Sequence, residues 1–207
     1  MNKKLLLVIV CFIFTLNTLN AQDQKFQFGL KVSPTLAWMK PDTKGISRDG
    51  AKLGFSYGIV ADYNFQPNYT FVTGLQVTYR GGGVKSGSYT ERWNLKYVEL
   101  PVAIKLKTKS FDKFRYFAQL GLVPGYNIST KLSTPAESDI DAHKDLRAFN
   151  LSMSIAAGAE YSLSGPTKLF GSLEFNNGFV DIVKGGEHTA DYKAVTNFVA
   201  LNIGVLF

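Results

Sequence analysis

LGFSYGIVADYNFQPNYTFVTGLQVTYR, residues 53–80, decides the fold because it contains the same period-two pattern twice, separated by a short break. Before the break, apolar or aromatic side chains occupy every second position: Leu53, Phe55, Tyr57, Ile59, Ala61, Tyr63 and Phe65. After Gln66-Pro67-Asn68 the alternation resumes with Tyr69, Phe71, Thr73, Leu75, Val77 and Tyr79. Successive side chains of a strand point to opposite faces, so the stretch predicts a β-hairpin with one apolar face. That face must lie against either a protein core or the hydrocarbon of a membrane.

Residues 1–21 have the layout of a secretory signal peptide. A basic start is followed by an apolar run over residues 5–16 and a polar stretch that ends in small Ala21. The apolar run is too short to span a membrane as an anchor. We therefore expect cleavage after Ala21 and a mature β-barrel domain over residues 22–207.

The charge and the cysteine content of the mature chain exclude several classes of protein. Cys11 is the single cysteine and lies inside the apolar run, so the mature chain has no disulfide and no Cys-ligated metal. Removal of Lys3 and Lys4 lowers the formal net charge from +7 to +5. The basic residues are scattered singly rather than gathered in a run, which argues against a nucleic-acid partner.

Period-two alternation recurs in eight segments along the chain. Their approximate ranges are 26–38, 53–65, 69–79, 97–107, 114–127, 149–161, 168–176 and 195–207. Long connections alternate with short ones: the long ones are 40–52, 81–93, 128–146 and 178–194, and the short ones are Gln66-Pro67-Asn68, Thr108–Asp112 and Ser164-Gly165-Pro166. This asymmetry is typical of outer-membrane barrels, with long external loops, short periplasmic turns and both termini inside. The sequence predicts an all-β, eight-stranded, antiparallel, up-and-down transmembrane β-barrel.

A soluble lipocalin-like carrier is the main structural rival, because its barrel also alternates but turns the apolar face inward. The polar face of this chain is rich in Gly, Ser, Ala and Asn, which suit a narrow lumen better than a water-facing exterior. Aromatic residues gather near strand ends on the apolar face, where membrane interfaces favour them. We assign this interfacial role to Trp38, Tyr57, Tyr63, Phe65, Tyr69 and Tyr79. The pattern favours a membrane barrel whose apolar face contacts outer-membrane lipids.

Two segments carry a resemblance to a known family. YVELPVAIKLK at 97–107, with Glu99-Leu100-Pro101 as its most specific part, and the terminal LNIGVLF resemble the PorT-like outer-membrane β-barrel family. The resemblance implies an outer-membrane location in a Gram-negative bacterium and an association with secretion-system or envelope proteins. It transfers no catalytic motif. Terminal Phe207 resembles the signal that the barrel-assembly machinery recognises in other outer-membrane proteins.

The sequence offers no recognisable catalytic or metal-binding motif. His143 and His188 lie in long connections beside acidic residues, but their spacing matches neither a zinc site nor a calcium loop. No activated Ser is recognisable, so a lipid-active enzyme stays a minor alternative and we expect neither cofactor nor metal. The triplet Gly81-Gly82-Gly83 is not a phosphate loop, and we interpret it as a flexible entry to the loop over 81–93.

Polar residues on the other face of the strands are predicted to fill the lumen. We place Lys31, Gln76, Glu99, Gln119 and Glu174 at middle depth, and Asp62, Lys105, Lys107, Arg115, Glu160 and Lys168 nearer the periplasmic end. Eight strands leave little internal diameter, and unpaired buried charges are costly. We therefore favour a salt-bridged plug over a narrow, gated pore.

The resulting functional hypothesis is a non-enzymatic outer-membrane barrel that supports protein secretion or envelope integrity through its loops. The connections over 128–146 and 178–194 are the expected recognition surfaces, because long loops on a rigid scaffold commonly carry function. A narrow porin-like channel and a soluble ligand carrier are the alternatives.

Overall fold

The computed structural model describes residues 25–184 and 192–207. Its elements are β1 (Phe26–Pro41), β2 (Ile46–Arg48), β3 (Lys52–Gln66), β4 (Tyr69–Ser86), β5 (Tyr89–Glu99), β6 (Val102–Lys107), β7 (Phe114–Ser133), β8 (Ile140–Asp141), the 3-10 turn η2 (His143–Asp145), β9 (Phe149–Ser162), β10 (Lys168–Gly178) and β11 (Ala194–Leu206). Among these elements there is no helix with the length and apolar character needed to cross a bilayer. The predicted signal peptide lies outside the described residues.

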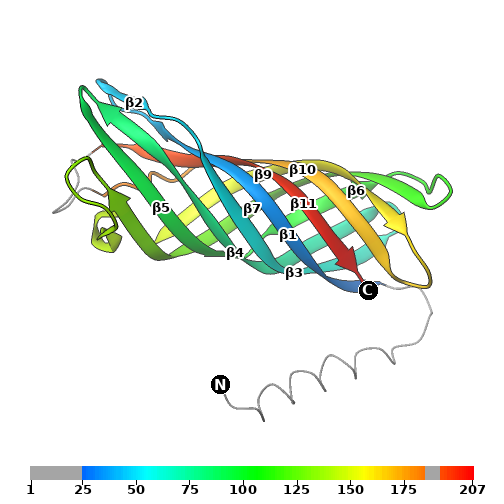
Figure 1. Cartoon of the computed structure of the whole chain (residues 1–207). Helices are drawn as coiled ribbons and strands as arrows, with labels where there is room; N and C mark the ends of the chain where they lie inside the picture. Colours follow the sequence, from blue (N-terminus) through cyan, green and yellow to red (C-terminus); the bar gives the residue numbers. More distant parts are fainter. Residues whose placement is uncertain (1–24, 185–191) are drawn as a thin grey trace, which may run out of the picture.

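The long strands form one closed antiparallel ring (Figure 1). Going round the wall, the order is β1, β3, β4, β5 with β6, β7, β9, β10 and β11, and β11 pairs with β1 to close the ring. Closure satisfies the edge groups that an open sheet would expose to hydrocarbon. Within the described residues the wall therefore has eight strands, which confirms the predicted up-and-down barrel.

The wall strand predicted over 97–107 is longer than expected and is interrupted. It begins at Tyr89 and is divided into β5 and β6 at Leu100-Pro101. Pro101 has no backbone N–H and cannot donate to the neighbouring strand, which explains the break. The Leu100 N–H keeps the wall connected by donating to the Pro124 carbonyl at 3.0 Å.

The prediction of a long loop over 81–93 is wrong. Strands β4 and β5 stay paired up to Ser86 and Tyr89, so only Gly87 and Ser88 remain as the turn between them. The connection is therefore a fully paired hairpin that rises beyond its neighbours at the end of the barrel bearing β2 and η2 (Figure 1). The loop predicted over 128–146 is likewise shortened, because β7 continues to Ser133.

The glycine triplet in this hairpin is a close-packing site rather than a flexible loop entry. A Cβ at Gly82 would lie 2.5 Å from the backbone nitrogen of Met39 on β1. A Cβ at Gly81 or Gly83 would collide with the carbonyl oxygen of Trp93 or Asp49. The missing side chains let β4 lean directly over β1 above the start of β3.

The two ends of the barrel differ. At the turn end, short connections over 67–68, 108–113 and 163–167 join the strands, close to the C-terminus (Figure 1). At the loop end lie the β4–β5 hairpin, the longer connections over 42–51 and 134–148, and residues 179–184, which follow β10. The three predicted short turns are confirmed.

Candidate functional site

Strand β5 exchanges its apolar and polar faces near Tyr97 and Val98. Toward the turn end the apolar residues point out: Leu75 is 49 % exposed, whereas neighbouring Gln76 is 5 % exposed and points inward. Toward the loop end the pattern is opposite, since Trp93, Leu95 and Tyr97 are buried inside while the residues between them are partly exposed outside. A strand with lipid outside carries its apolar residues outward, whereas one surrounded by water carries them inward. The reversal therefore indicates the level at which β5 leaves the bilayer.

Apolar side chains fill the barrel at the loop end. This apolar plug consists of Met39, Val84, Trp93, Leu95, Tyr97, Leu132, Ala142, Leu146, Ile182, Val183, Tyr192 and Ala194. Two of its polar groups are paired: Trp93 Nε1 donates to the Tyr192 hydroxyl at 3.0 Å, and that hydroxyl donates to Glu91 Oε2 at 2.9 Å, whereas the buried Tyr97 hydroxyl has no hydrogen-bond partner among the described residues. Buried Trp and Tyr usually find such partners.

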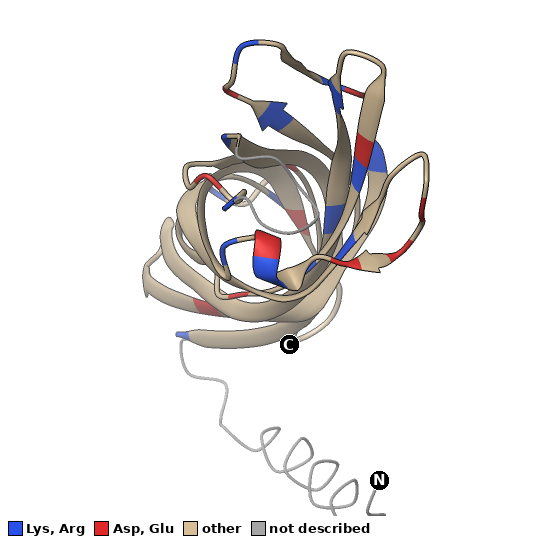
Figure 2. Ribbon diagram, turned by 90° about the vertical axis from the view of Figure 1, so that its left-hand side faces the viewer, with Lys and Arg blue, Asp and Glu red and all other residues tan. Residues whose placement is uncertain are grey.

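Two connections fold inward to complete the plug. Leu146 and Val183 form a β-bridge, the Arg147 N–H donates to the Ile182 carbonyl at 2.8 Å, and the Lys184 N–H donates to the Asp145 carbonyl at 2.9 Å. Seen from the loop end, the short helical turn lies across the opening of the ring (Figure 2). The connections over 134–148 and 179–184 thus cover the lumen instead of extending away from it.

A buried polar layer lies below the plug. Arg80 Nη1 is 3.0 Å from Glu99 Oε1, and both side chains are fully buried. Glu99 Oε2 also accepts hydrogen bonds from Gln76 at 2.7 Å and Thr78 at 2.6 Å. The Arg80 guanidinium lies 4.1 Å from the centre of the Tyr97 ring and 5.8 Å from that of Phe198, which belongs to β11. Because β3 and β1 separate β4 from β11 in the wall, this arginine reaches across the lumen.

A charge cluster crosses the lumen nearer the turn end. Its members are Asp62 of β3, Lys105 and Lys107 of β6, and Glu160 of β9. Lys105 Nζ lies 2.5 Å from Asp62 Oδ2 and 3.2 Å from Glu160 Oε1, and Lys107 Nζ lies 3.2 Å from the same Glu160 oxygen. Two buried cations thus face two buried carboxylates from three strands. Such pairing offsets the cost of removing the charges from water.

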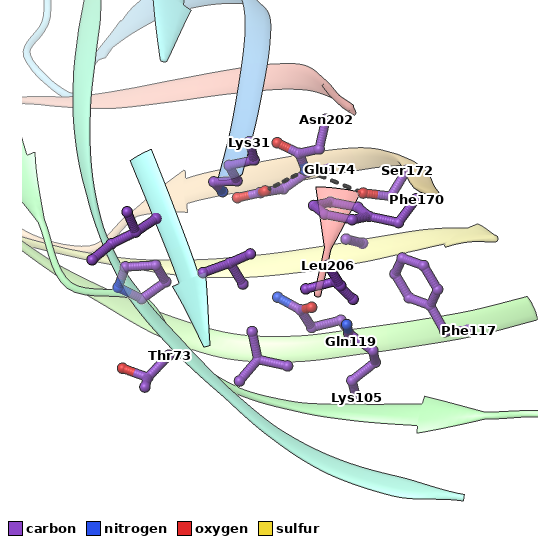
Figure 3. A pocket seen from close by; sticks show the side chains of 15 residues that line it. Lys31, Thr73, Lys105, Phe117, Gln119, Phe170, Ser172, Glu174, Asn202 and Leu206 are labelled. Atoms are coloured by element: carbon purple, nitrogen blue, oxygen red, sulfur yellow. Dashed lines mark hydrogen bonds between the residues drawn. The ribbon is translucent and has the colours of Figure 1, made fainter. Parts of the chain in front are cut away.

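A cavity lies between the polar layer and the charge cluster (Figure 3). Its lining combines Lys31, Gln119 and Glu174 with the apolar side chains of Phe117 and Phe170. Asn202 Nδ2 donates to Glu174 Oε2 at 2.8 Å and to Ser172 Oγ at 3.2 Å. The polar side of the cavity is therefore held by bonds within the wall.

The residues predicted to form one lumen network lie at three levels. Lys31, Gln119 and Glu174 line the cavity, Gln76 and Glu99 join the polar layer, and Glu160 joins the charge cluster. Arg115 lies opposite Glu160 in the register, but its buried Nε has no hydrogen-bond partner among the described residues. The network is thus divided, and Arg115 is adjacent to it without an observed bond.

The predicted interfacial aromatics form two groups on the outer surface. Tyr63, Phe65 and Tyr69 follow one another at the turn end, with ring centres 6.5 and 6.2 Å apart. Tyr57 and Tyr79 are neighbours toward the loop end, with ring centres 6.4 Å apart. Trp38 stacks on outward-facing Phe175 at 6.3 Å, and Phe207 is 54 % exposed at the turn end.

Arg80 and the apolar plug are the features that sequence reasoning missed. Arg80 stands at the edge of a segment interpreted as a loop. A signal was present: Trp93, Leu95 and Tyr97 alternate with Asn94 and Lys96, which is a strand pattern. Its phase is opposite to that of Val98 and Leu100, so it would have predicted both a longer strand and the reversal of facing.

The comparisons with known proteins agree with this geometry. A model of the family described as the outer membrane protein beta-barrel domain matches residues 20–184. The chain belongs to this outer-membrane β-barrel family. Membership places the protein in the outer membrane of a Gram-negative bacterium. The narrower PorT-like assignment remains a proposal.

Comparison with solved structures finds similar outer-membrane proteins at low sequence identity, and the first of those given below shares the fold. Neisserial surface protein A is 14 % identical with a TM-score of 0.55, and the match covers 86 % of this chain and 95 % of that one. A major outer membrane protein of Thermus thermophilus is 12 % identical with a TM-score of 0.49, and the match covers 88 % of this chain and 98 % of that one. OprG of Pseudomonas aeruginosa is 11 % identical with a TM-score of 0.48, and the match covers 87 % of this chain and 95 % of that one. No curated protein sequence matches the chain.

Proposed function

We propose that the protein is a non-enzymatic, non-conducting barrel that supports the integrity of the outer membrane through its outer surface. The observation that carries this proposal is the filling of the lumen at separate levels. The apolar plug covers the loop end, and the charge cluster crosses the barrel nearer the turn end. A barrel filled in this way acts through its outer surface and its raised hairpin and does not carry solutes along its axis.

A narrow channel is the second candidate, favoured by the cavity between the two filled levels. Its polar lining includes Lys31 and Glu174, which an ion could contact if the closures moved. Single-channel recording in planar bilayers separates the two candidates. We expect no stable ion-selective conductance from the purified wild-type protein. Persistent conductance steps in the wild type would overturn the proposed closed lumen.

A variant with an opened plug provides the positive control for that recording. Replacing Trp93 by Ala and Leu132 by Ala removes two large, fully buried side chains from the loop end. Replacing exposed Tyr89 by Ala removes a large side chain from the same hairpin but not from the plug. Because the charge cluster still crosses the barrel in the plug variant, the complete positive control adds Lys105→Ala and Glu160→Ala, and ion leakage should rise only when both levels are opened.

A role in protein secretion is the narrower form of the proposal, and the PorT-like resemblance of residues 97–107 supports it. A deletion strain should be scored for secreted cargo and for entry of a large antibiotic that an intact outer membrane excludes. Envelope support predicts increased antibiotic entry with normal cargo export. Loss of cargo with an intact permeability barrier would favour the secretion role instead. Recognition of Phe207 by the barrel-assembly machinery stays a prediction.

A further inference from the structure

The outer face of the raised β4–β5–β7 wall carries a series of basic residues. Across these strands, Tyr79 lies opposite Lys96, Gly81 opposite Asn94, and Gly83 opposite Arg92. Asn94 in turn lies opposite Lys131 of β7. Lys52 lies over Gly81, since its Cδ would be 3.3 Å from a Cβ placed there. The basic face therefore consists of Lys52, Lys85, Arg92, Lys96 and Lys131.

These cations point away from the barrel. The residues between them on β5, namely Trp93 and Leu95, are buried in the plug. Lys85 and Arg92 are exposed, and the Lys131 side chain is 54 % exposed. Figure 2 shows Lys and Arg positions along this raised part of the wall. The basic face is accessible from outside the barrel.

Few acidic groups of the described residues oppose this charge. Asp139 lies 3.8 Å from Lys131 and also interacts electrostatically with Lys52, and Asp141 lies opposite Lys131 in the register, so these two lysines are partly neutralised. Asp49 also lies beside Gly83: its N–H donates to the Gly83 carbonyl at 2.9 Å, and its Cβ would be 3.1 Å from a Cβ placed on Gly83. Glu91, the acidic residue of β5 nearest to Arg92, faces inward and binds the Tyr192 hydroxyl. Within the part of the chain that the structure describes, the five cations of this face outnumber the nearby carboxylates of Asp49, Asp139 and Asp141, and Arg92 and Lys96 form no ion pair.

The basic face begins directly above the last row that is apolar on all four of the neighbouring strands, while outward-facing Phe55 and Tyr79 of β3 and β4 continue to the level of Lys96. Tyr57, Val77, Val98 and Tyr126 lie opposite one another on four adjacent strands and form this row. Lys96 lies two residues further along β5 toward the loop end, and its Nζ lies 5.0 Å from the centre of the Tyr79 ring. With a rise of about 3.4 Å per residue and a strand tilt of about 45°, Lys96 lies roughly 5 Å and Arg92 roughly 14 Å above the row. The polar region of a leaflet is about 5–8 Å thick, so the cations extend from the headgroups into the layer above them.

We infer that this basic face binds phosphate-bearing glycolipids of the outer leaflet. Cations at several heights suit a lipid whose phosphates and sugars extend beyond the glycerol level of an ordinary phospholipid. Basic residues beside an anionic membrane surface each strengthen attachment, and several adjacent ones act together. A neighbouring glycolipid held in this way would link the barrel to the surrounding leaflet. The inference rests on the proposed function because it names the partner of the same outer surface.

The test compares two variants with the same change in charge. In the outer variant, Lys52, Arg92 and Lys96 are each replaced by Gln. In the control variant, the exposed residues Lys25, Lys109 and Lys113 at the turn end are each replaced by Gln. Purified proteins in a zwitterionic detergent are titrated with fluorescent bisphosphorylated lipid A, and binding is followed by anisotropy. Phosphatidylcholine and dextran sulfate serve as the neutral-lipid and soluble-polyanion competitors.

We expect the wild type and the control variant to bind lipid A within about twofold of each other, and the outer variant to bind on the order of a hundredfold more weakly. Equal binding by all three proteins, or equal loss in both variants, would overturn the inference. Competition by dextran sulfate at the same charge concentration, without preference for lipid A, would assign the face to a soluble polyanion instead.

Two further measurements keep these outcomes distinct. Heat-modifiable migration on a gel reports whether each variant is folded. If the triple outer variant does not fold, the single Arg92→Gln and Lys96→Gln proteins should each weaken binding several-fold, and unchanged binding in both would overturn the inference. Bilayer conductance of the same wild-type sample tests the closed lumen separately. A conducting barrel that still binds lipid A would reject only the proposed function.

Discussion

Neutralising Glu160 tests the charge cluster most directly. Its carboxylate is buried, with 1 % of the residue exposed, and Oε1 lies 3.2 Å from both Lys105 Nζ and Lys107 Nζ. At an effective dielectric constant of about 20, each such contact is worth about 5 kcal/mol before desolvation is subtracted. Glu160→Gln keeps the size of the side chain but leaves two buried lysines facing Asp62 alone. Removing one partner of a buried pair costs about 3–5 kcal/mol, so we expect the free energy of unfolding to fall by that amount.

Urea unfolding of the protein in phospholipid vesicles measures this loss, with the fluorescence of Trp38 and Trp93 as the signal. Glu137→Gln removes an exposed carboxylate that is outside the cluster and should change the free energy of unfolding by less than about 0.5 kcal/mol. Adding Lys107→Met to Glu160→Gln removes the excess cation and should restore part of the loss. A loss below about 1 kcal/mol for Glu160→Gln would refute the argument that the cluster holds the lumen together.

Three other substitutions test separate parts of the structure. Leu75→Arg places a charge on the lipid-facing surface and should cost about 2–4 kcal/mol in the same unfolding assay, whereas Ser88→Arg in the exposed turn should cost little. Trp93→Ala opens the plug, so added protease should cleave the loop end faster while the heat-modifiable barrel persists; unchanged cleavage would argue against packing as the closure. Gly82→Val would force a side chain into the backbone of Met39, and should loosen the β4–β5 hairpin in the same proteolysis assay.

The barrel could be predicted from the sequence because its strongest signals are local. Alternation around Gln66-Pro67-Asn68 fixes a hairpin and its two faces, and the placement of Leu75 outward and Gln76 inward follows from that phase alone. The tight turns could also be located, since Pro, Gly and Asn mark them. These features depend on residues that are close in sequence.

The hairpin beyond Arg80 could not be predicted in the same way, because an apolar outer face was expected along the whole length of each wall strand. Outward apolar residues indicate a wall strand only where lipid lies outside. Above Val98 the outside is water, so the apolar side of the strand turns inward. The prediction of a flexible loop at the glycine triplet was wrong because it depended on local sequence alone. Gly82 is needed for the close contact with β1 and not for the conformation of a loop.

The sequence by itself determined an eight-stranded barrel, its turns and the face that each residue of the lipid-facing strands presents, because alternation and turn chemistry act between near neighbours. Only the tertiary structure decided which polar residues meet inside. It paired Arg80 with Glu99 and brought Asp62 and Glu160 to the same two lysines from opposite walls. It also folded the connections over 134–148 and 179–184 into the opening. The physical reason is closure: ring order, register and tilt fix distances across the lumen, and no local pattern of residues contains those distances.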